Sequence, residues 1–338
     1  MAVLAAFAFA AGSVLIRKGT SRSSRDNGVF LSILFTALMA ALLELAVVWQ
    51  RGWPRVSMAG LTWFALSGIM LSVVGRDFFF ASIRKLGSVR GTAVNKMNAF
   101  FAVMIGVLFL GEPFTYTLLI GAALVFVGLF LMFRQSVVTE RANREEAAAS
   151  MRPGTVSVRI DPVVGAASAD ARVFATTPGA DFSWRHRFLA FRGSIAMGYV
   201  LGVIGAFGYA TGNSLMKKGL FEVGDPFLGT LVGSLAAILL FLLLSLFDEQ
   251  HRISVQAVGQ RWNLWFLASG IAVSVGQVLF MLSLYYIEVS RAALISTIDA
   301  VVAIFLSALI FRTQEGITRT TVLATMGFVA GAAVLIMG

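Results

Sequence analysis

Long apolar runs, separated by short polar stretches, recur along almost the whole chain. Ten of these runs approach or exceed the length of about 20 apolar residues that a helix needs to cross a bilayer core. They cover residues 2–16, 29–49, 59–83, 91–110, 114–133, 195–216, 227–247, 263–287, 290–311 and 318–337. Because lipid offers the backbone no hydrogen-bond partners, each run must form a helix. The pattern predicts an all-α integral membrane protein with ten transmembrane helices.

One polar segment, residues 135–194, separates the first five runs from the last five. It contains three prolines and many charged residues, a composition typical of disordered chain. Its last part, residues 182–192, mixes aromatic residues with arginines and suits a membrane interface, either as a plain anchor or as a lipid sensor. We therefore expect a first five-helix repeat over residues 1–134, a basic and largely disordered linker over 135–194, and a second repeat over 195–338.

The two halves resemble each other in sequence. With a shift of 200, residues 9–19 match residues 209–219 at five of eleven positions. A shift of 201 pairs Gly75 with Gly276, Ser82 with Ser283, Arg90 with Arg291 and Asn98 with Asp299. A shift of 203 pairs Glu112 with Glu315 and Thr115 with Thr318. Five helices is an odd number, so the halves must cross the membrane in opposite senses. Such inverted repeats are typical of secondary transporters, and the alternative is a duplication in a membrane protein that transports nothing.

Glycines mark a helix contact in the second half. They recur at steps of three or four in the sixth run, at Gly198, Gly202, Gly205, Gly208 and Gly212. This spacing draws one continuous stripe along a helix face, and small residues let a second helix approach closely. The stripe predicts a tightly packed helix pair.

Three local motifs carry a family resemblance. They are the Lys-Gly end of the first helix in each half, at residues 18–19 and 218–219, the sequence Leu-Gly-Glu-Pro-Phe-Thr at residues 110–115, and the glycines Gly121 and Gly128 that follow it. With these motifs the chain resembles the ten-helix EamA-type branch of the drug/metabolite transporter superfamily. The resemblance implies a metabolite transporter whose cavity lies between helices one, three, four, six, eight and nine. The matching turn of the second half, residues 313–318, departs from the motif.

Composition and charge exclude several other classes of protein. The chain is 58% hydrophobic and only 13% charged, so it is not a soluble enzyme. It has no cysteine and two histidines, which leaves no thiolate chemistry and few metal ligands. A net charge of +10 is explained by arginines that set membrane topology rather than by nucleic-acid binding. No phosphate-binding P-loop sequence is present, so we expect no ATP hydrolysis. We expect no cofactor, no metal site and no catalytic residue.

Charge distribution and family resemblance predict opposite orientations in the membrane. Counted on alternate sides of the predicted helices, 20 Lys and Arg residues lie on the side of the linker and 5 on the other. The positive-inside rule then places the linker in the cytoplasm and both termini outside. The family resemblance implies the reverse. Either orientation fits a multi-pass protein of the inner (plasma) membrane.

Ionisable and amide residues inside the predicted spans of the first half are candidate solute-binding groups, because a charge in the bilayer is costly unless it faces a cavity or a partner. They are Arg76, Asp77, Asn95, Lys96 and Asn98. Arg76 or Lys96 could hold a carboxylate of a solute. Alternatively, Asp77 pairs with Lys96 or Arg76 and only joins helices.

The second half contributes Asn213, Gln277, Ser296 and Asp299. Ser296 and Asp299 lie three residues apart, on one face of a helix. Asp299 is the candidate for proton coupling, because burial favours the protonated form of a lone carboxyl group. The alternative is a structural aspartate held by hydrogen bonds.

We therefore expect a secondary transporter of a small organic metabolite, such as an amino acid or a related solute. It would work by alternating access, either coupled to protons or as a facilitator. Its partners would be the solute and the lipid bilayer, without nucleic acid. The competing interpretations are a membrane-embedded enzyme acting on lipids and a scaffold or sensor without transport.

Overall fold

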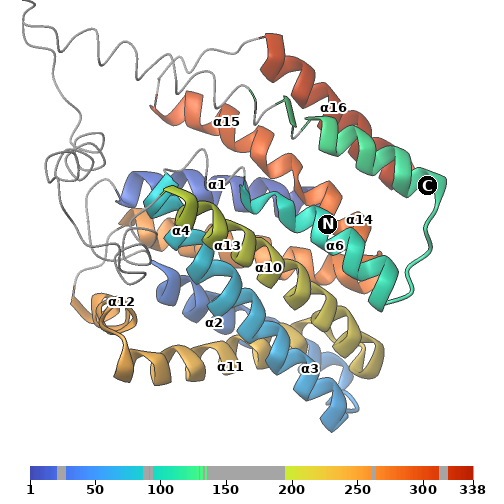
Figure 1. Cartoon of the computed structure of the whole chain (residues 1–338). Helices are drawn as coiled ribbons and strands as arrows, with labels where there is room; N and C mark the ends of the chain where they lie inside the picture. Colours follow the sequence, from blue (N-terminus) through green and yellow to red (C-terminus); the bar gives the residue numbers. More distant parts are fainter. Residues whose placement is uncertain are drawn as a thin grey trace, which may run out of the picture.

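A computed structural model describes residues 1–20, 28–86, 91, 94–128, 130–131, 134, 195–260, 264–311 and 319–337. Within these ranges all regular secondary structure is helical, which confirms the all-α prediction (Figure 1). The predicted linker lies outside the described residues, and so does the turn at 313–318 that includes Glu315.

The helices agree closely with the apolar runs. The first half contains α1 (Ala2–Thr20), α2 (Val29–Arg51), α3 (Met58–Ile69), η1 (Met70–Asp77), α4 (Phe78–Leu86), α6 (Met97–Phe109) and a helix at Tyr116–Gly128. The second half contains α10 (Ile195–Val223), α11 (Pro226–Phe247), α12 (Glu249–Gln260), α13 (Leu264–Tyr286), α14 (Val289–Ser296), α15 (Ile298–Phe311) and α16 (Arg319–Met337). Four of the described helices are long and apolar enough to cross a membrane, namely Val29–Arg51, Met58–Ser82, Pro226–Phe247 and Leu267–Tyr286, and shorter apolar helices accompany them.

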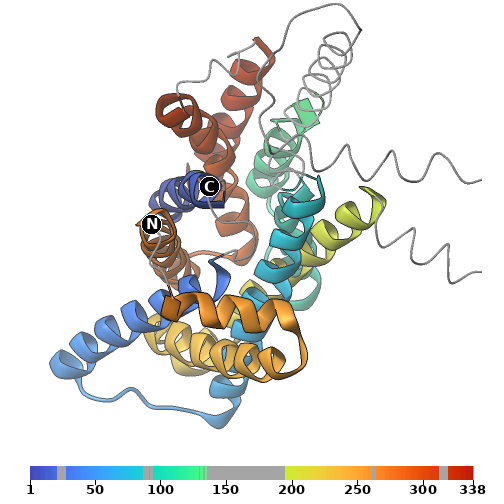
Figure 2. The same cartoon turned by 90° about the vertical axis from the view of Figure 1, so that its left-hand side faces the viewer.

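The two halves exchange their first helices. α1 packs on α13, α14 and α15 of the second half, whereas α10 packs on α3, η1, α4 and α6 of the first half. Figure 2 shows α1, in dark blue, beside the orange and red helices. Two glycine contacts repeat this exchange, because Gly75 faces the ring of Tyr209 while its repeat partner Gly276 faces the ring of Phe9. The bundle core is thus shared between the halves.

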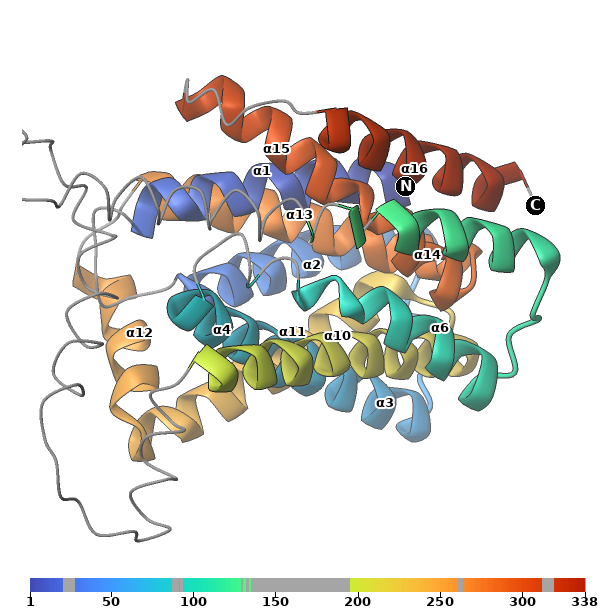
Figure 3. The ribbon, with the colours of Figure 1, turned by 45° about the horizontal axis from the view of Figure 1, so that its top comes forward.

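The helix directions fit the same scheme. Figure 3 shows that α1 and α10 run in opposite directions and that both termini lie at the end of the bundle opposite α12. We call the end with the termini the terminal end and the end with α12 the α12 end. This arrangement is compatible with the predicted inverted repeats of five helices each.

The third predicted span is one long helix whose middle is a π-helix. η1 (Met70–Asp77) joins α3 to α4 and buries five of its eight residues, among them Ser72 and Arg76. A π-helical turn contains more residues than an α-helical turn, and such segments concentrate at functional sites. Here the wider turn brings Arg76 into the interior of the bundle.

The fourth and ninth spans are both kinked, at corresponding positions. Near Lys96 the N–H of Ala99 donates to the Lys96 carbonyl at 3.2 Å, a bond of the 3₁₀ type. Near Thr297 the N–H of Ala300 donates to the Thr297 carbonyl at 3.1 Å. Both positions correspond under the shift of 201 that aligns the sequences of the halves.

The predicted glycine stripe of α10 packs closely on the third span, as expected. A Cβ on Gly205 would lie 2.9 Å from the backbone nitrogen of Phe79, and one on Gly208 would lie 2.9 Å from that of Gly75. A second close crossing joins α3 to α11, where a Cβ on Gly68 would lie 1.9 Å from the carbonyl oxygen of Gly233. At these points only glycine lets the helix backbones meet.

α12 is a helix that the apolar pattern does not predict. It follows α11 directly and packs on α11 and α2 at the α12 end of the bundle. Val255 and Val258 contact the apolar cluster around Phe30 and Phe241. Its remaining residues are mainly polar, so its sequence resembles a loop between two spans.

Candidate functional site

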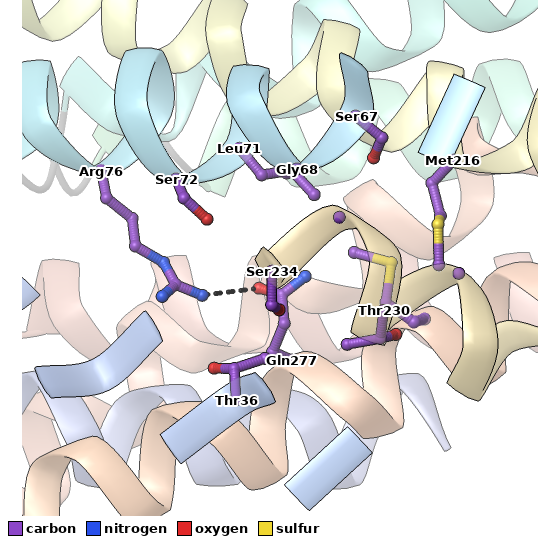
Figure 4. A pocket seen from close by; sticks show the side chains of 13 residues that line it. Thr36, Ser67, Gly68, Leu71, Ser72, Arg76, Met216, Thr230, Ser234 and Gln277 are labelled. Atoms are coloured by element: carbon purple, nitrogen blue, oxygen red, sulfur yellow. Dashed lines mark hydrogen bonds between the residues drawn. The ribbon is translucent and has the colours of Figure 1, made fainter. Parts of the chain in front are cut away.

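Arg76 lies at the centre of the candidate site. Its side chain is buried, with 4% of the residue exposed. One guanidinium nitrogen donates to Ser32 Oγ at 3.2 Å and another donates to Gln277 Oε1 at 3.3 Å (Figure 4). The side chain of Tyr209 also interacts with the guanidinium group. Arg76 and Gln277 are 201 residues apart, so they are repeat partners that meet where the two halves join.

These partners of Arg76 are all neutral. Within the described part of the chain no carboxylate forms an ion pair with Arg76. A buried charge that lacks a counter-charge is costly, and intramembrane charges usually serve a substrate or ion path. The guanidinium group is therefore suited to bind an anionic group of a solute in two-point geometry.

A small polar cavity adjoins Arg76 (Figure 4). Its volume is about 20 Å³, enough for a single water molecule. Hydroxyl groups dominate its polar lining, which consists of Thr36, Ser67, Ser72, Thr230, Ser234, Arg76 and Gln277. No acidic residue is among the described residues that line it. In this conformation the cavity is too small to hold an organic solute.

The cavity lies only partly where the family resemblance implies it. The third, sixth and eighth spans contribute through η1, α10 and α13, as expected. The second and seventh spans also contribute, through Thr36 of α2 and Thr230 and Ser234 of α11. None of the lining residues comes from the first, fourth or ninth span among the described residues.

Asp77 pairs with a residue other than Lys96 or Arg76, the two partners expected from the sequence. Its Oδ2 atom lies 3.3 Å from Nε2 of His251 on α12. The other ring nitrogen of His251 lies 2.5 Å from Asp248 Oδ2. Asp77 thus links the third span to α12 and is not among the described residues that line the cavity.

Lys96 and Asp299 form an ion pair between the kinks of the fourth and ninth spans. Their side chains are 8% and 19% exposed. The expectation of a lone carboxylate at Asp299 is therefore wrong in this conformation, because the pair neutralises both charges. The pair also joins the two halves.

The remaining predicted residues, two of which are buried, lie outside the cavity lining. Asn95 and Asn213 are buried, and their Oδ1 atoms accept no hydrogen bond from the described residues. Ser296 donates to the Ala293 carbonyl of its own helix at 2.7 Å, and Asn98 is half-buried. Of the nine predicted residues, only Arg76 and Gln277 line the cavity.

The cavity hydroxyls are functional candidates that sequence reasoning missed. Thr36 Oγ1 donates to the Ser32 carbonyl at 2.8 Å, and Thr230 Oγ1 donates to the Pro226 carbonyl at 2.7 Å. Because such bonds satisfy a hydroxyl inside its own helix, Ser and Thr occur in apolar spans without any functional role. The only available signal was their clustering in spans two, three and seven.

Comparisons with known proteins place this fold. A solved structure described only as the crystal structure of a protein aligns with a TM-score of 0.62 at 14% identity, covering 99% of this chain and 98% of that one. At this identity the likeness shows the fold alone. No curated protein matches the chain. The sequence profile of the EamA-like transporter family matches residues 1–134 and 196–337, which are both halves of the chain. The chain therefore belongs to the EamA-like transporter family, within the drug/metabolite transporter superfamily.

Proposed function

We propose that this protein is a secondary transporter of a small organic solute that carries an anionic group, such as an amino acid or a related metabolite. The observation that carries the proposal is Arg76, a buried cation beside a polar cavity, held by neutral groups alone among the described residues. An anionic solute supplies the missing counter-charge. The family, which consists of membrane transporters, supports transport over a lipid-modifying enzyme or a scaffold.

The chemistry around Arg76 favours a solute with further polar groups. Hydroxyls of Ser72, Thr36 and Ser234 line the same cavity. They donate and accept hydrogen bonds, so they suit hydroxyl, amino or carbonyl groups of a metabolite. The guanidinium group binds a carboxylate or phosphate more specifically than it binds neutral groups.

Alternating access explains how so small a cavity can serve transport. A site with room for one water must expand before an organic solute enters, and expansion requires the halves to separate. Residues 1–134 and 195–338 act as the two inverted repeats, with the site where they join and residues 135–194 as their linker. Such repeats rock against each other around a fixed site near the bilayer midplane. We place the protein in the inner membrane as a multi-pass protein.

The ion pair of Lys96 and Asp299 is the proposed point of proton coupling. A proton that binds to Asp299 removes its charge and weakens the bond between the kinks of the two halves. Proton uptake then favours separation of the halves at this place. If the solute instead crosses without a proton, the pair is structural and the protein is a facilitator.

The test is uptake and counterflow in proteoliposomes with a panel of labelled metabolites, with and without a pH gradient. Wild type is compared with empty liposomes, with Arg76→Gln and with Asp299→Asn. We expect gradient-driven uptake of at least one anionic or zwitterionic solute, its loss in Arg76→Gln, and loss of the gradient effect in Asp299→Asn. Absence of flux for every anionic and zwitterionic solute would overturn the proposal.

A further inference from the structure

Glu112 makes an unusual contact between the halves. It follows α6 in the Leu-Gly-Glu-Pro motif and is buried, with 9% of the residue exposed. Its carboxylate accepts hydrogen bonds from the N–H of Val289 at 2.6 Å and from the N–H of Ser290 at 3.1 Å. The hydroxyl of Ser290 donates to the same carboxylate. Glu112 of the first half thus caps the first turn of α14 in the second half.

The local residue cannot replace this cap. Glu288 occupies the N-cap position of α14, but its side chain makes no capping hydrogen bond. It instead pairs with Arg291 at 3.1 Å near the surface. The free N–H groups of the first helical turn therefore depend on the carboxylate of Glu112.

Lys217 also stabilises the turn between α13 and α14. Its ammonium group donates to the carbonyls of Leu284 at 2.6 Å and Ile287 at 3.0 Å, at the end of α13. Lys217 belongs to the second half, as do α13 and α14. The turn between α13 and α14 is thus fixed within its own half by Lys217 and is bonded to the first half by Glu112.

α6 and α14 form an antiparallel pair that is closed at both ends. Lys96 at the start of α6 meets Asp299 beyond the end of α14, and Glu112 beyond the end of α6 meets the start of α14. The Glu112 contact joins the end of α6 to the start of α14, and Figure 3 shows both helices toward the terminal end of the bundle. Packing is dense there, because a Cβ on Gly106 would lie 2.3 Å from Glu112 Oε2 and 2.4 Å from Ser290 Oγ.

We propose that Glu112 is the latch of the terminal end. Its release from Val289 and Ser290 accompanies opening of the site toward that end, while the Lys96–Asp299 pair stays closed. When the site opens toward the α12 end, the Lys96–Asp299 pair separates and Glu112 stays bound to Val289 and Ser290. This inference rests on the alternating access of the proposed function and adds to it the residue that closes one face.

Labelling of introduced cysteines tests the latch, because it measures how accessible each part of the bundle is to a reagent. The chain contains no cysteine, so a single introduced cysteine gives an unambiguous label. Ala293→Cys on α14 reports on the terminal end, and Ala300→Cys beyond the kink reports on the middle of the ninth span. Both alanines are buried, at 2% and 3% exposure, so a label reaches them only when the protein opens. The rate of maleimide labelling in purified protein measures how often each site opens.

We expect Glu112→Gln to raise the labelling rate of Ala293→Cys about tenfold or more. Loss of a hydrogen bond to a charged group shifts the equilibrium between closed and open states by about that factor. The rate at Ala300→Cys stays unchanged or falls. The matched control is Glu288→Gln, the same change of carboxylate to amide in the same turn, which leaves both rates unchanged. Ser290→Ala removes only one of the three contacts, so it gives a smaller rise and keeps the test available if Glu112→Gln does not fold.

Three results would overturn the latch: no rise at Ala293→Cys, an equal rise at both reporters, or an equal rise in Glu288→Gln. An equal rise at both reporters means general loosening of the fold. The labelling needs no solute, so it is independent of flux. Labelling that follows the expected pattern without flux for any solute contradicts the proposed function alone, whereas flux without the labelling pattern contradicts the latch alone.

Discussion

Removal of one partner of the Lys96–Asp299 pair should cost more stability than removal of both. The two side chains are 8% and 19% exposed, so neither is fully solvated. Loss of one partner of a buried pair typically costs about 3–5 kcal/mol, because the other charge remains buried without compensation. The partial exposure of Asp299 places the single variants Lys96→Met and Asp299→Asn near the lower limit, at about 3 kcal/mol each.

The double variant leaves two uncharged side chains in the same space. Replacement of a buried ion pair by neutral residues of similar size is often close to neutral. We therefore expect Lys96→Met/Asp299→Asn to lie within about 1 kcal/mol of wild type, with a coupling free energy of several kcal/mol in the double-mutant cycle.

The assay is reversible unfolding in mixed micelles, followed by circular dichroism as the fraction of denaturing detergent rises. The four proteins of the cycle are measured under one set of conditions. Additive costs in the double variant would refute the reasoning, because they would mean that Lys96 and Asp299 do not interact. Single variants within about 0.5 kcal/mol of wild type would refute it as well, since that is the range of ordinary surface substitutions.

Three further predictions concern packing and capping. Gly68→Ala should lower the unfolding temperature and the yield of folded protein, because the added Cβ would meet the backbone of Gly233. The cost of this overpacking is about 3 kcal/mol or more, and an unchanged unfolding temperature would contradict the close crossing. Lys217→Met should destabilise the protein by about 2 kcal/mol in the unfolding assay, because two bonds to carbonyl groups are lost. Lys218→Met, at the exposed neighbour, loses only a contact with the ring of Trp63 and should cost less than about 1 kcal/mol; equal effects would contradict the capping role. His251→Ala should speed amide hydrogen exchange in α12 severalfold while exchange in α13 stays unchanged, and protection equal to wild type would show that His251 does not fasten α12.

The positions of the described apolar helices followed from the sequence because hydrophobic length is a direct requirement of the bilayer. The sequence also identified the glycine stripe of α10, since helix spacing alone decides which glycines share a face. α12 was missed because its composition is polar on average, like that of a loop between two spans. The π-helical segment at η1, which packs against α10, leaves no signal in the apolar pattern of the third span.

Two of the residues that line the cavity were predicted from the sequence, but the pairs that the charged residues form were not. Arg76 and Gln277 stood out as polar groups inside spans, and they meet in the structure. Asp299 pairs with Lys96 of the other half, and Asp77 pairs with His251 of the unpredicted helix. Each pair joins residues of different halves that lie far apart in the chain, so no local pattern records it. Glu112 was visible only as part of a motif, because its bonds to α14 join segments far apart in the chain.

The measurement that tests the central claim most directly is counterflow of one solute in two chemical forms. The carboxylate form and its uncharged amide are compared as competitors for labelled solute in vesicles that contain wild type or Arg76→Gln. If Arg76 binds the anionic group, wild type prefers the carboxylate by about tenfold to a hundredfold, as expected for a charge-assisted pair, and Arg76→Gln loses that preference. An equal preference for the carboxylate in both proteins would contradict the account.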